Sequence, residues 1–346
     1  MSEHTLHRDS APYGRRTGMK IFNTLALVGG VAFIIHALRD DRDALITALT
    51  IEPTSLLTAV ALLVVYFLLY SYRFVILVEH HCKRRLGVIA WFKMLVVMRF
   101  MNNVVPQMGT IYRGVRLKRD FGVSYTDYIS ANVFFIWSDT IFNFIVAALA
   151  LAMTGHHLDL WGFDATRLLT GGVIALVLLP YLSRTLLACA PSGQGTLNRI
   201  LKKMSTVADD LATSITDIPY MLRVNGVALL SFITMALVFQ TLLGTVGIIL
   251  PAPTLAVFYA LYRLTFHINI TPGNIGIREA AFGLLCSQAD VAASTGILVS
   301  TELRILSIVV LIALGLLFAS GELRAAWRSL RAGAPESSPP PPPTAV

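Results

Sequence analysis

Two arginines, Arg113 and Arg278, each end a pattern of asparagine, proline and glycine that interrupts a long apolar segment. A guanidinium group donates paired hydrogen bonds that suit a phosphate. Glycine allows close backbone approach, and a helix that begins after such a turn presents free N–H groups and a positive dipole end. The two patterns therefore predict a binding site for an oxyanion such as a phosphate head group. In chain order their residues are Asn103, Pro106, Gly109 and Arg113, and then Asn269, Pro272, Gly273, Gly276 and Arg278.

Other residues beside these patterns are candidates for the same site. Arg116 lies one helical turn beyond the arginine of the first pattern and shares its face. Asn103 and Asn269 either cap the interrupted helices or bond a head-group hydroxyl. Glu279 directly follows the arginine of the second pattern, so the two side chains diverge by about 100° on a helix. Glu279 either couples to protons or contacts an amine, or it is a first-turn glutamate stabilised by the helix dipole.

Charged groups also lie within apolar spans, where they are costly and normally face a cavity or a partner. For Asp139 we expect an ion pair with an arginine of an interrupted segment, and Arg263 is a candidate of the same kind. Glu302 and Arg304 are further candidates for coupling or an ion pair, although Glu302 lies near a predicted span end, where it can instead reach the interface. His267 precedes the second turn, and it either titrates near neutral pH or is a hydrogen-bonded packing group.

The sequence contains none of the GxSxG, Walker A, HExxH and CxxC motifs, so we predict no catalytic site, metal or cofactor. Two histidine pairs lack partners at ligand spacing, and the three cysteines are scattered. Transport without chemistry is the first interpretation. The alternatives are a membrane-embedded transferase, with Asp139 or Glu279 as its base, and a non-transporting scaffold of a lipid or glycan pathway.

The composition indicates an all-α polytopic membrane protein. The chain has 346 residues, of which 55% are hydrophobic and 14% charged, and its mean hydropathy is +0.68. This is too apolar for an ordinary soluble domain. The net charge of +8 comes from basic residues at the ends of apolar runs, where topology-setting charges are found. We therefore expect a membrane partner and no nucleic acid.

Six apolar stretches are long enough to cross a bilayer, which takes about 20 helical residues. They cover approximately residues 21–38, 55–78, 129–153, 168–189, 224–250 and 296–319. Two more segments, 87–119 and 254–289, are broken near the middle by the proline and glycine of the two patterns. Irregular backbone survives at membrane depth only where protein or a wet cavity encloses it. We therefore predict that both segments are re-entrant helical hairpins.

Charge placement predicts the topology. If the hairpin at 87–119 enters from the cytoplasm, the basic loops fall inside and both termini are cytoplasmic. The hairpin at 254–289 then enters from the opposite face, which makes the two halves inverted repeats, as in many transporters. The predicted units are a cytoplasmic tail (1–19), a transmembrane domain (20–325) and a disordered proline-rich tail (326–346). The transmembrane domain contains repeat one (about 55–153), an amphipathic linker helix (about 196–218) and repeat two (about 224–319).

The stretches NNVVPQMGTIYRGVRLKRDFGVSY and TPGNIGIREAAF, in that order, resemble the two most recognisable stretches of the lysylphosphatidylglycerol synthase transmembrane, or flippase-like, family. The resemblance covers approximately residues 20–325. Gln107 and Thr110 stand where the family usually has a glycine and an acid, and Asn274 stands where it often has glycine. A narrow substrate assignment therefore does not follow from the resemblance.

The resemblance implies a lipid translocator of the cell (inner) membrane. The family includes the flippase half of the multiple peptide resistance factor and stand-alone proteins proposed to move polyprenyl-linked or hopanoid-related lipids. Nothing after residue 325 resembles the soluble aminoacyl transferase domain of bifunctional members, so the translocation half alone is implied. The implied ligand is an anionic phospholipid or a polyprenyl-phosphate lipid. A lipid- or glycan-synthesis enzyme and a second copy of the chain are compatible partners.

Overall fold

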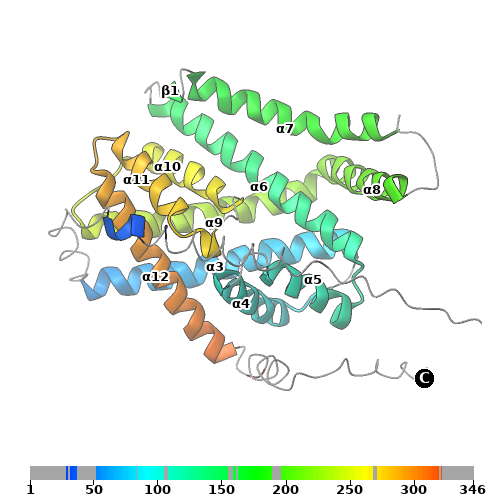
Figure 1. Ribbon diagram of the computed structural model, residues 1–346, viewed down its shortest axis with the longest axis horizontal. Helices are drawn as coiled ribbons and strands as arrows, with labels where there is room; N and C mark the ends of the chain where they lie inside the picture. The colour runs from blue at the N-terminus through cyan, green and yellow to red at the C-terminus, as the bar shows by residue number, and fades with distance from the viewer. Residues whose placement is uncertain are drawn as a thin grey trace, which may run out of the picture.

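The computed structural model describes residues 29, 32–36, 52–83, 85–104, 108–154, 159–160, 163–188, 196–267, 271–318 and 321. These residues are mainly α-helical (Figure 1), apart from short connections and a pair of two-residue antiparallel strands, β1 (Asp159–Leu160) and β2 (Phe163–Asp164). The predicted all-α class is therefore confirmed. The predicted tails at 1–19 and 326–346 lie outside the described residues, as does most of the predicted span at 21–38.

Five helices in the described part are long and apolar enough to cross a membrane. They are α3 (Pro53–Cys82), α6 (Tyr125–Thr154), α7 (Ala165–Ala188), α9 (Ile218–Thr245) and α12 (Ala293–Phe318). Each coincides with one of the predicted spans. At a rise of about 1.5 Å per residue, α3 and α6 extend about 45 Å, which exceeds a hydrocarbon core of about 30 Å.

The ends of these helices follow local signals in the sequence. Pro53 begins α3, where its missing N–H leaves no helical bond unmade. Lys83 ends α3 in a left-handed conformation with φ 50° and ψ 31°. At the start of α9, the backbone N–H of Tyr220 donates to the carboxylate of Asp217 at 3.1 Å, which caps the helix.

The amphipathic segment between the two halves forms the helix α8 (Thr196–Thr216). Its buried residues include Ala208, Leu211 and Ala212, and the helix packs against α6, α7 and α9. Figure 1 shows α8 beside the ends of these helices, opposite the end that carries β1. The apolar stripe of α8 therefore covers protein in this structure.

Two segments between the long helices are interrupted in the middle. We call 88–121 the first interrupted pair and 252–287 the second. The first contains α4 (Val88–Val104) and α5 (Met108–Phe121), and the second contains α10 (Ala252–Leu264), η1 (Thr265–His267), η2 (Pro272–Asn274) and α11 (Ile277–Ser287). The helix α4 ends at Val104 and α5 begins at Met108, with residues 105–107 outside the described part, while η2 begins at Pro272.

Gly109 allows the first interrupted pair to close. A Cβ atom at this position would lie 2.0 Å from the carbonyl oxygen of Met98, so a larger residue would push α5 away from α4. The N–H of Gly109 donates to Oδ1 of Asn102 at 2.7 Å. The capping contact thus involves Asn102, which the sequence pattern passed over, while the side chain of Asn103 lies outside the described residues.

The helices α3 and α9 run antiparallel. Near the end of α3 and the start of α9, Arg223 donates to the hydroxyl of Tyr72 at 2.6 Å, and the rings of His80 and Tyr220 stack with centroids 3.7 Å apart. One interrupted pair follows each of these helices along the chain. The two pairs therefore start from opposite ends of the molecule, with α4 and α5 on the lower right and α10 and α11 on the upper left of Figure 1.

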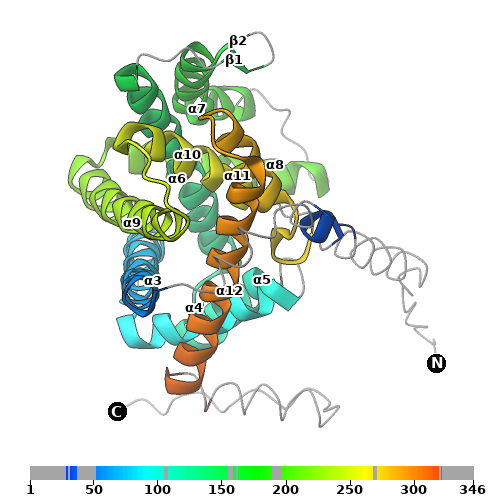
Figure 2. The same ribbon diagram turned by 90° about the vertical axis from the view of Figure 1, so that its left-hand side faces the viewer.

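The outer surface of the long helices is rich in exposed apolar side chains. Leu57, Leu149, Leu222 and Leu317 are each more than 60% exposed. An apolar surface of this extent is unusual for a soluble monomer and fits contact with lipid. Figure 2, turned by 90°, shows α3 and α9 on the left and α12 running down from α11 toward α4.

Candidate functional site

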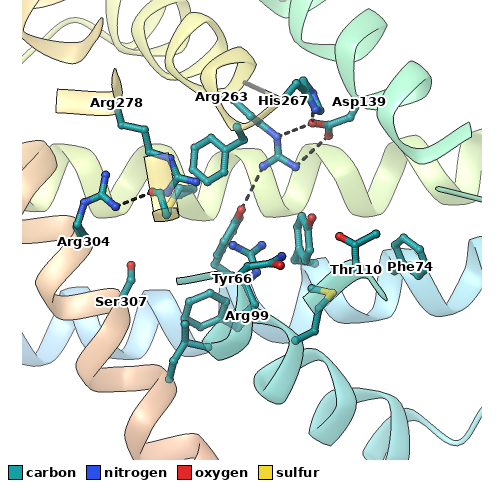
Figure 3. A pocket seen from close by; sticks show the side chains of 18 of the residues that line it. Tyr66, Phe74, Arg99, Thr110, Asp139, Arg263, His267, Arg278, Arg304 and Ser307 are labelled. Atoms are coloured by element: carbon teal, nitrogen blue, oxygen red, sulfur yellow. Dashed lines mark hydrogen bonds and ion pairs between the residues drawn. The ribbon is translucent and has the colours of Figure 1, made fainter. Parts of the chain in front are cut away.

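A cavity of about 330 Å³ lies where the two interrupted pairs approach each other (Figure 3). Side chains of α3, α6 and α12 complete its wall. Its size is in the range of small-molecule sites. Asp139 is the one carboxylate among the lining residues of the described chain. The lining arginines are Arg99, Arg113, Arg263, Arg278 and Arg304.

The turn of the second interrupted pair is held in a left-handed conformation. Gly273 has φ 59°, Asn274 has φ 56° and Gly276 has φ 84°, and glycine adopts this region at little cost. The buried amide of Asn274 donates to the carbonyl oxygen of Thr265 at 3.1 Å. The hydroxyl of Thr271 donates to the carbonyl oxygen of Ile275 at 3.1 Å. The turn is therefore fixed before any ligand binds.

Glu279 is a structural residue of this turn. Its carboxylate accepts a hydrogen bond from the N–H of Gly276 at 2.8 Å and from Nε of Arg304 at 2.6 Å, and its side chain is fully buried. Arg304 also donates to the carbonyl oxygens of Gly273 at 2.6 Å and Asn274 at 3.1 Å. The interpretation of Glu279 as a first-turn glutamate thus fits the geometry better than a proton or amine contact.

This arrangement changes one expectation for the helix α11. The sequence suggested that the helix start after Gly276 would offer free N–H groups to an anion, but the N–H of Gly276 already bonds to Glu279. A buried carboxylate at the N-terminus of a helix is stabilised by the dipole. The Glu279 carboxylate therefore takes the place of a bound anion at the Gly276 N–H. A ligand must be held by other groups.

Asp139 lies at the centre of a second buried network. Its carboxylate accepts hydrogen bonds from Arg73 at 2.5 Å and from Arg263 at 2.9 and 3.0 Å, and Nε2 of His267 lies 3.8 Å away. Arg263 also donates to the hydroxyl of Tyr259 at 2.9 Å. The network joins α6 to α3 and α10, so it fixes the second interrupted pair to the long helices.

Three lining arginines have no carboxylate partner in the described part of the chain and stack on aromatic rings instead. The guanidinium of Arg99 lies 4.4 Å from the ring centroid of Tyr70, that of Arg113 4.0 Å from Phe74, and that of Arg278 3.7 Å from Phe266. Such contacts attract a cation to the ring face. We call Arg99, Arg113 and Arg278 the stacked arginines.

The stacked arginines retain unused hydrogen-bonding capacity. Arg113 donates to the hydroxyl of Tyr128 at 2.9 Å and to Oδ1 of Asn132 at 2.6 Å, both neutral groups. The buried Nε atoms of Arg99 and Arg278 have no hydrogen-bond partner among the described residues. Buried polar groups are normally bonded, so each of these two side chains carries a donor that no described protein group satisfies.

Arg116 does not line the cavity. It pairs with Asp120 one turn along α5 and donates to the hydroxyl of Tyr112 at 3.0 Å. Partial burial raises the pKa of Asp120, and hydrogen bonds from Arg119 and Arg116 lower it by more, so that the pKa lies below its usual value. The predicted shared face of Arg113 and Arg116 therefore brings only Arg113 to the site.

Glu302 also differs from the expectation. It lies well inside α12 instead of at a span end, and both of its carboxylate oxygens are buried without a hydrogen-bond partner in the described part. It is not a lining residue of the cavity. The sequence placed it near the interface because the apolar run appeared to begin at about residue 296, whereas the helix begins at Ala293.

The cavity gathers several of the residues that the sequence singled out and leaves others elsewhere. The predicted residues that line it are Arg113, Asp139, Arg263, His267, Gly273, Arg278 and Arg304. Gly109, Gly276 and Glu279 shape the two turns behind it. Pro106 and Asn269, with the side chain of Pro272, lie outside the described residues.

Sequence reasoning missed Arg73 and Arg99. Each is a single arginine within an apolar helix, and the cost of such a charge was the available signal. No group of three or more histidine, cysteine, aspartate or glutamate side chains gathers at metal-binding distance among the described residues.

Comparison with known proteins gives one match. The profile of a protein family described as the lysylphosphatidylglycerol synthase TM region matches residues 23–315. This range contains both interrupted pairs and every lining residue of the cavity, and it agrees with the resemblance seen in the sequence. No curated protein and no solved structure matches the chain.

Proposed function

Because this multi-pass membrane protein belongs to the lysylphosphatidylglycerol synthase transmembrane family, we propose that it is a lipid translocator that binds an anionic head group between its two interrupted pairs. The observation that carries the proposal is the cavity itself. Each interrupted pair contributes stacked arginines to it, Arg99 and Arg113 from one and Arg278 from the other. Charged groups at membrane depth are retained where they serve a ligand or a pathway.

The same cavity has room for the apolar part of a lipid. On the side of α12 it is lined by Leu303, Ile308 and Leu311, so a head group can meet the arginines while the first part of an acyl or prenyl chain meets aliphatic side chains. A site with convergent polar groups and an apolar wall is typical of an amphipathic ligand. This supports a lipid over a free inorganic anion as the transported species.

Both interrupted pairs act as re-entrant hairpins in this proposal. The helices α4, α5, α10 and α11 have 17, 14, 13 and 11 residues, so the arms span about 16 to 26 Å, less than a hydrocarbon core of about 30 Å. The pairs start from opposite ends of the molecule, as inverted repeats require. Alternating access then follows from movement of one half against the other around a fixed site.

We assign the end of the molecule at which α4 begins to the cytoplasm of a cell with an inner membrane. Lys83, Arg85, Lys118 and Arg119 lie at or near the helix ends there, and basic residues concentrate on the cytoplasmic side. The assignment places both termini in the cytoplasm, as the sequence predicted.

The transferase alternative needs an available base beside the head group. Asp139 is held by two arginines and Glu279 by Arg304 and a backbone N–H. Both carboxylates are already engaged by groups of the protein, so these contacts favour translocation over group transfer.

The proposal is tested with the purified chain in liposomes that carry fluorescent phospholipids with anionic head groups. Membrane-impermeant dithionite reduces only the outer leaflet, so translocation appears as loss of the protected half of the signal. Arg278→Ala should reduce the rate at least tenfold, while Arg119→Ala, which changes an exposed arginine outside the cavity, should not. A wild-type rate equal to that of protein-free liposomes would refute the proposal.

A further inference from the structure

The charges around the cavity are strongly unbalanced. Six arginines belong to it or to its networks, namely Arg73, Arg99, Arg113, Arg263, Arg278 and Arg304, and two carboxylates contact them, Asp139 and Glu279. Six positive charges less two negative charges leave a net charge of +4 among the described groups. An excess of this size in a partly desolvated site is costly unless a ligand offsets it.

The unbalanced charges come from both halves of the molecule and act on each other. Arg278 lies within electrostatic range of Arg99 and Arg304, and Arg99 and Arg263 both act on Tyr66. Figure 3 shows Arg278 and Arg304 on one side of Tyr66, Arg263 and Asp139 on the other, and Arg99 below it. A single ligand can therefore be approached by donors from several directions.

A phosphodiester head group would offset this excess poorly. It carries one negative charge, whereas a terminal phosphate carries about 1.5 to 2 negative charges at pH 7 and offers three strong acceptor oxygens. The terminal N–H groups of the stacked arginines, of which only one from Arg113 has an acceptor among the described residues, suit a ligand with several oxygens. An aminoacylated head group adds an ammonium that the same excess repels.

We propose that the site selects lipids whose head group ends in a phosphomonoester or contains a diphosphate, and disfavours phosphodiester and aminoacylated head groups. The inference rests on the proposed function, because it names the ligand class of the same cavity. It separates the two ligand classes that the sequence resemblance left open, since a polyprenyl phosphate ends in a phosphomonoester and most anionic phospholipids carry a phosphodiester.

Binding of short-chain lipids to the detergent-solubilised full chain tests the inference directly. Phosphatidic acid is the phosphomonoester probe and phosphatidylglycerol of the same chains is the phosphodiester probe. We expect phosphatidic acid to bind about tenfold more tightly, since each added negative charge near several arginines is worth at least about one decade in affinity. Equal affinity for the two lipids would overturn the inference.

A pH series separates head-group charge from other differences between the probes. The second pKa of a phosphomonoester is about 6, so its affinity should rise about tenfold between about pH 5 and about pH 7.5. Phosphatidylglycerol keeps its single charge over this range and controls for titration of His267, Asp139 and Glu279, which face the arginines from η1, α6 and α11. A parallel rise for both lipids would overturn the inference.

Matched variants locate the effect. Arg99→Gln should remove most of the preference for phosphatidic acid, while Arg119→Gln should keep it. Glycerol 3-phosphate serves as the soluble phosphomonoester. If it competes as well as phosphatidic acid, the ligand is not a lipid and the inference fails.

Transport then distinguishes failure of the inference from failure of the proposed function. Liposomes with fluorescent phosphatidic acid, phosphatidylglycerol and lysylphosphatidylglycerol should show rates that fall in that order. Transport of phosphatidylglycerol or lysylphosphatidylglycerol at least as fast as phosphatidic acid would refute the selectivity but keep translocation. Selective binding with no transport of any lipid would support the ligand class and refute the translocator.

Discussion

The cavity contains two kinds of arginine, and they have different partners. Arg263 and Arg304 bind carboxylates of the protein, Asp139 and Glu279, with distances of 2.6 to 3.0 Å. The stacked arginines rest on aromatic rings and have no carboxylate partner in the described chain. A paired arginine holds elements together, whereas a stacked one is positioned with its charge still available. The difference separates groups that build the site from groups that can bind a ligand.

The largest effect is expected at Asp139. Asp139→Asn leaves Arg73 and Arg263 buried without their anion, and breaking such a pair costs about 3 to 5 kcal/mol. Thermal unfolding of the purified protein in detergent measures this loss. Asp120→Asn, which changes a partly exposed acid on α5, is the matched control. A variant at Asp139 that unfolds at the wild-type temperature would show that this network does not hold the second interrupted pair.

A smaller loss is expected at Glu279. Glu279→Gln keeps an oxygen that can accept from Gly276 but removes the charge that pairs with Arg304, so we expect about 2 to 3 kcal/mol of destabilisation. The double variant Glu279→Gln with Arg304→Gln should recover part of this loss in the same unfolding measurement. Strict additivity of the two changes would contradict a coupled pair.

The stacked arginines should behave in the opposite way. Arg99→Gln and Arg278→Gln leave no carboxylate without an ion-pair partner, so the free energy of unfolding should change by about 1 kcal/mol or less, the size of a cation–π contact. Lipid translocation should fall strongly in both variants. Paired measurements of unfolding and translocation check this. A loss of stability as large as that of Asp139→Asn would erase the distinction between the two kinds of arginine.

The smallest effect is expected at Arg116, which sequence reasoning placed in the site and the structure places outside the cavity. Its ion pair with Asp120 is partly exposed, and such pairs contribute about 0.2 to 1 kcal/mol. Arg116→Gln should therefore leave both the unfolding temperature and the translocation rate close to wild type. A translocation rate of Arg116→Gln as low as that of Arg278→Ala would show that Arg116 takes part in the site.

Much of the fold follows from local sequence. Apolar runs of spanning length predicted the five long helices of the described part, because a bilayer requires helices of about this length. Proline and glycine located both breaks, since the first cannot continue a helix and the second permits left-handed backbone. The family was also visible in the sequence, and the profile match confirms it.

The roles of individual charges did not follow from local sequence. Arg113 and Arg116 share a helical face, yet only Arg113 reaches the cavity, because α5 packs so that Arg113 faces Tyr128 and Asn132 of α6. Arg73 and Arg99 were missed because their partners, Asp139 and Tyr70, come from other helices. Such contacts depend on how helices cross, which no periodicity within one helix records.

The sequence by itself determined that this chain is a helical membrane protein with two interrupted segments and a surplus of arginines, because apolar length, helix breakers and charge are local properties. Only the tertiary structure decided which arginines are neutralised. Asp139 and Glu279 each meet an arginine from another helix, and the arginines left on aromatic faces form no ion pair with an acid among the described residues. Pairing of buried charges is set by helix packing, and the function proposed here depends on that pairing.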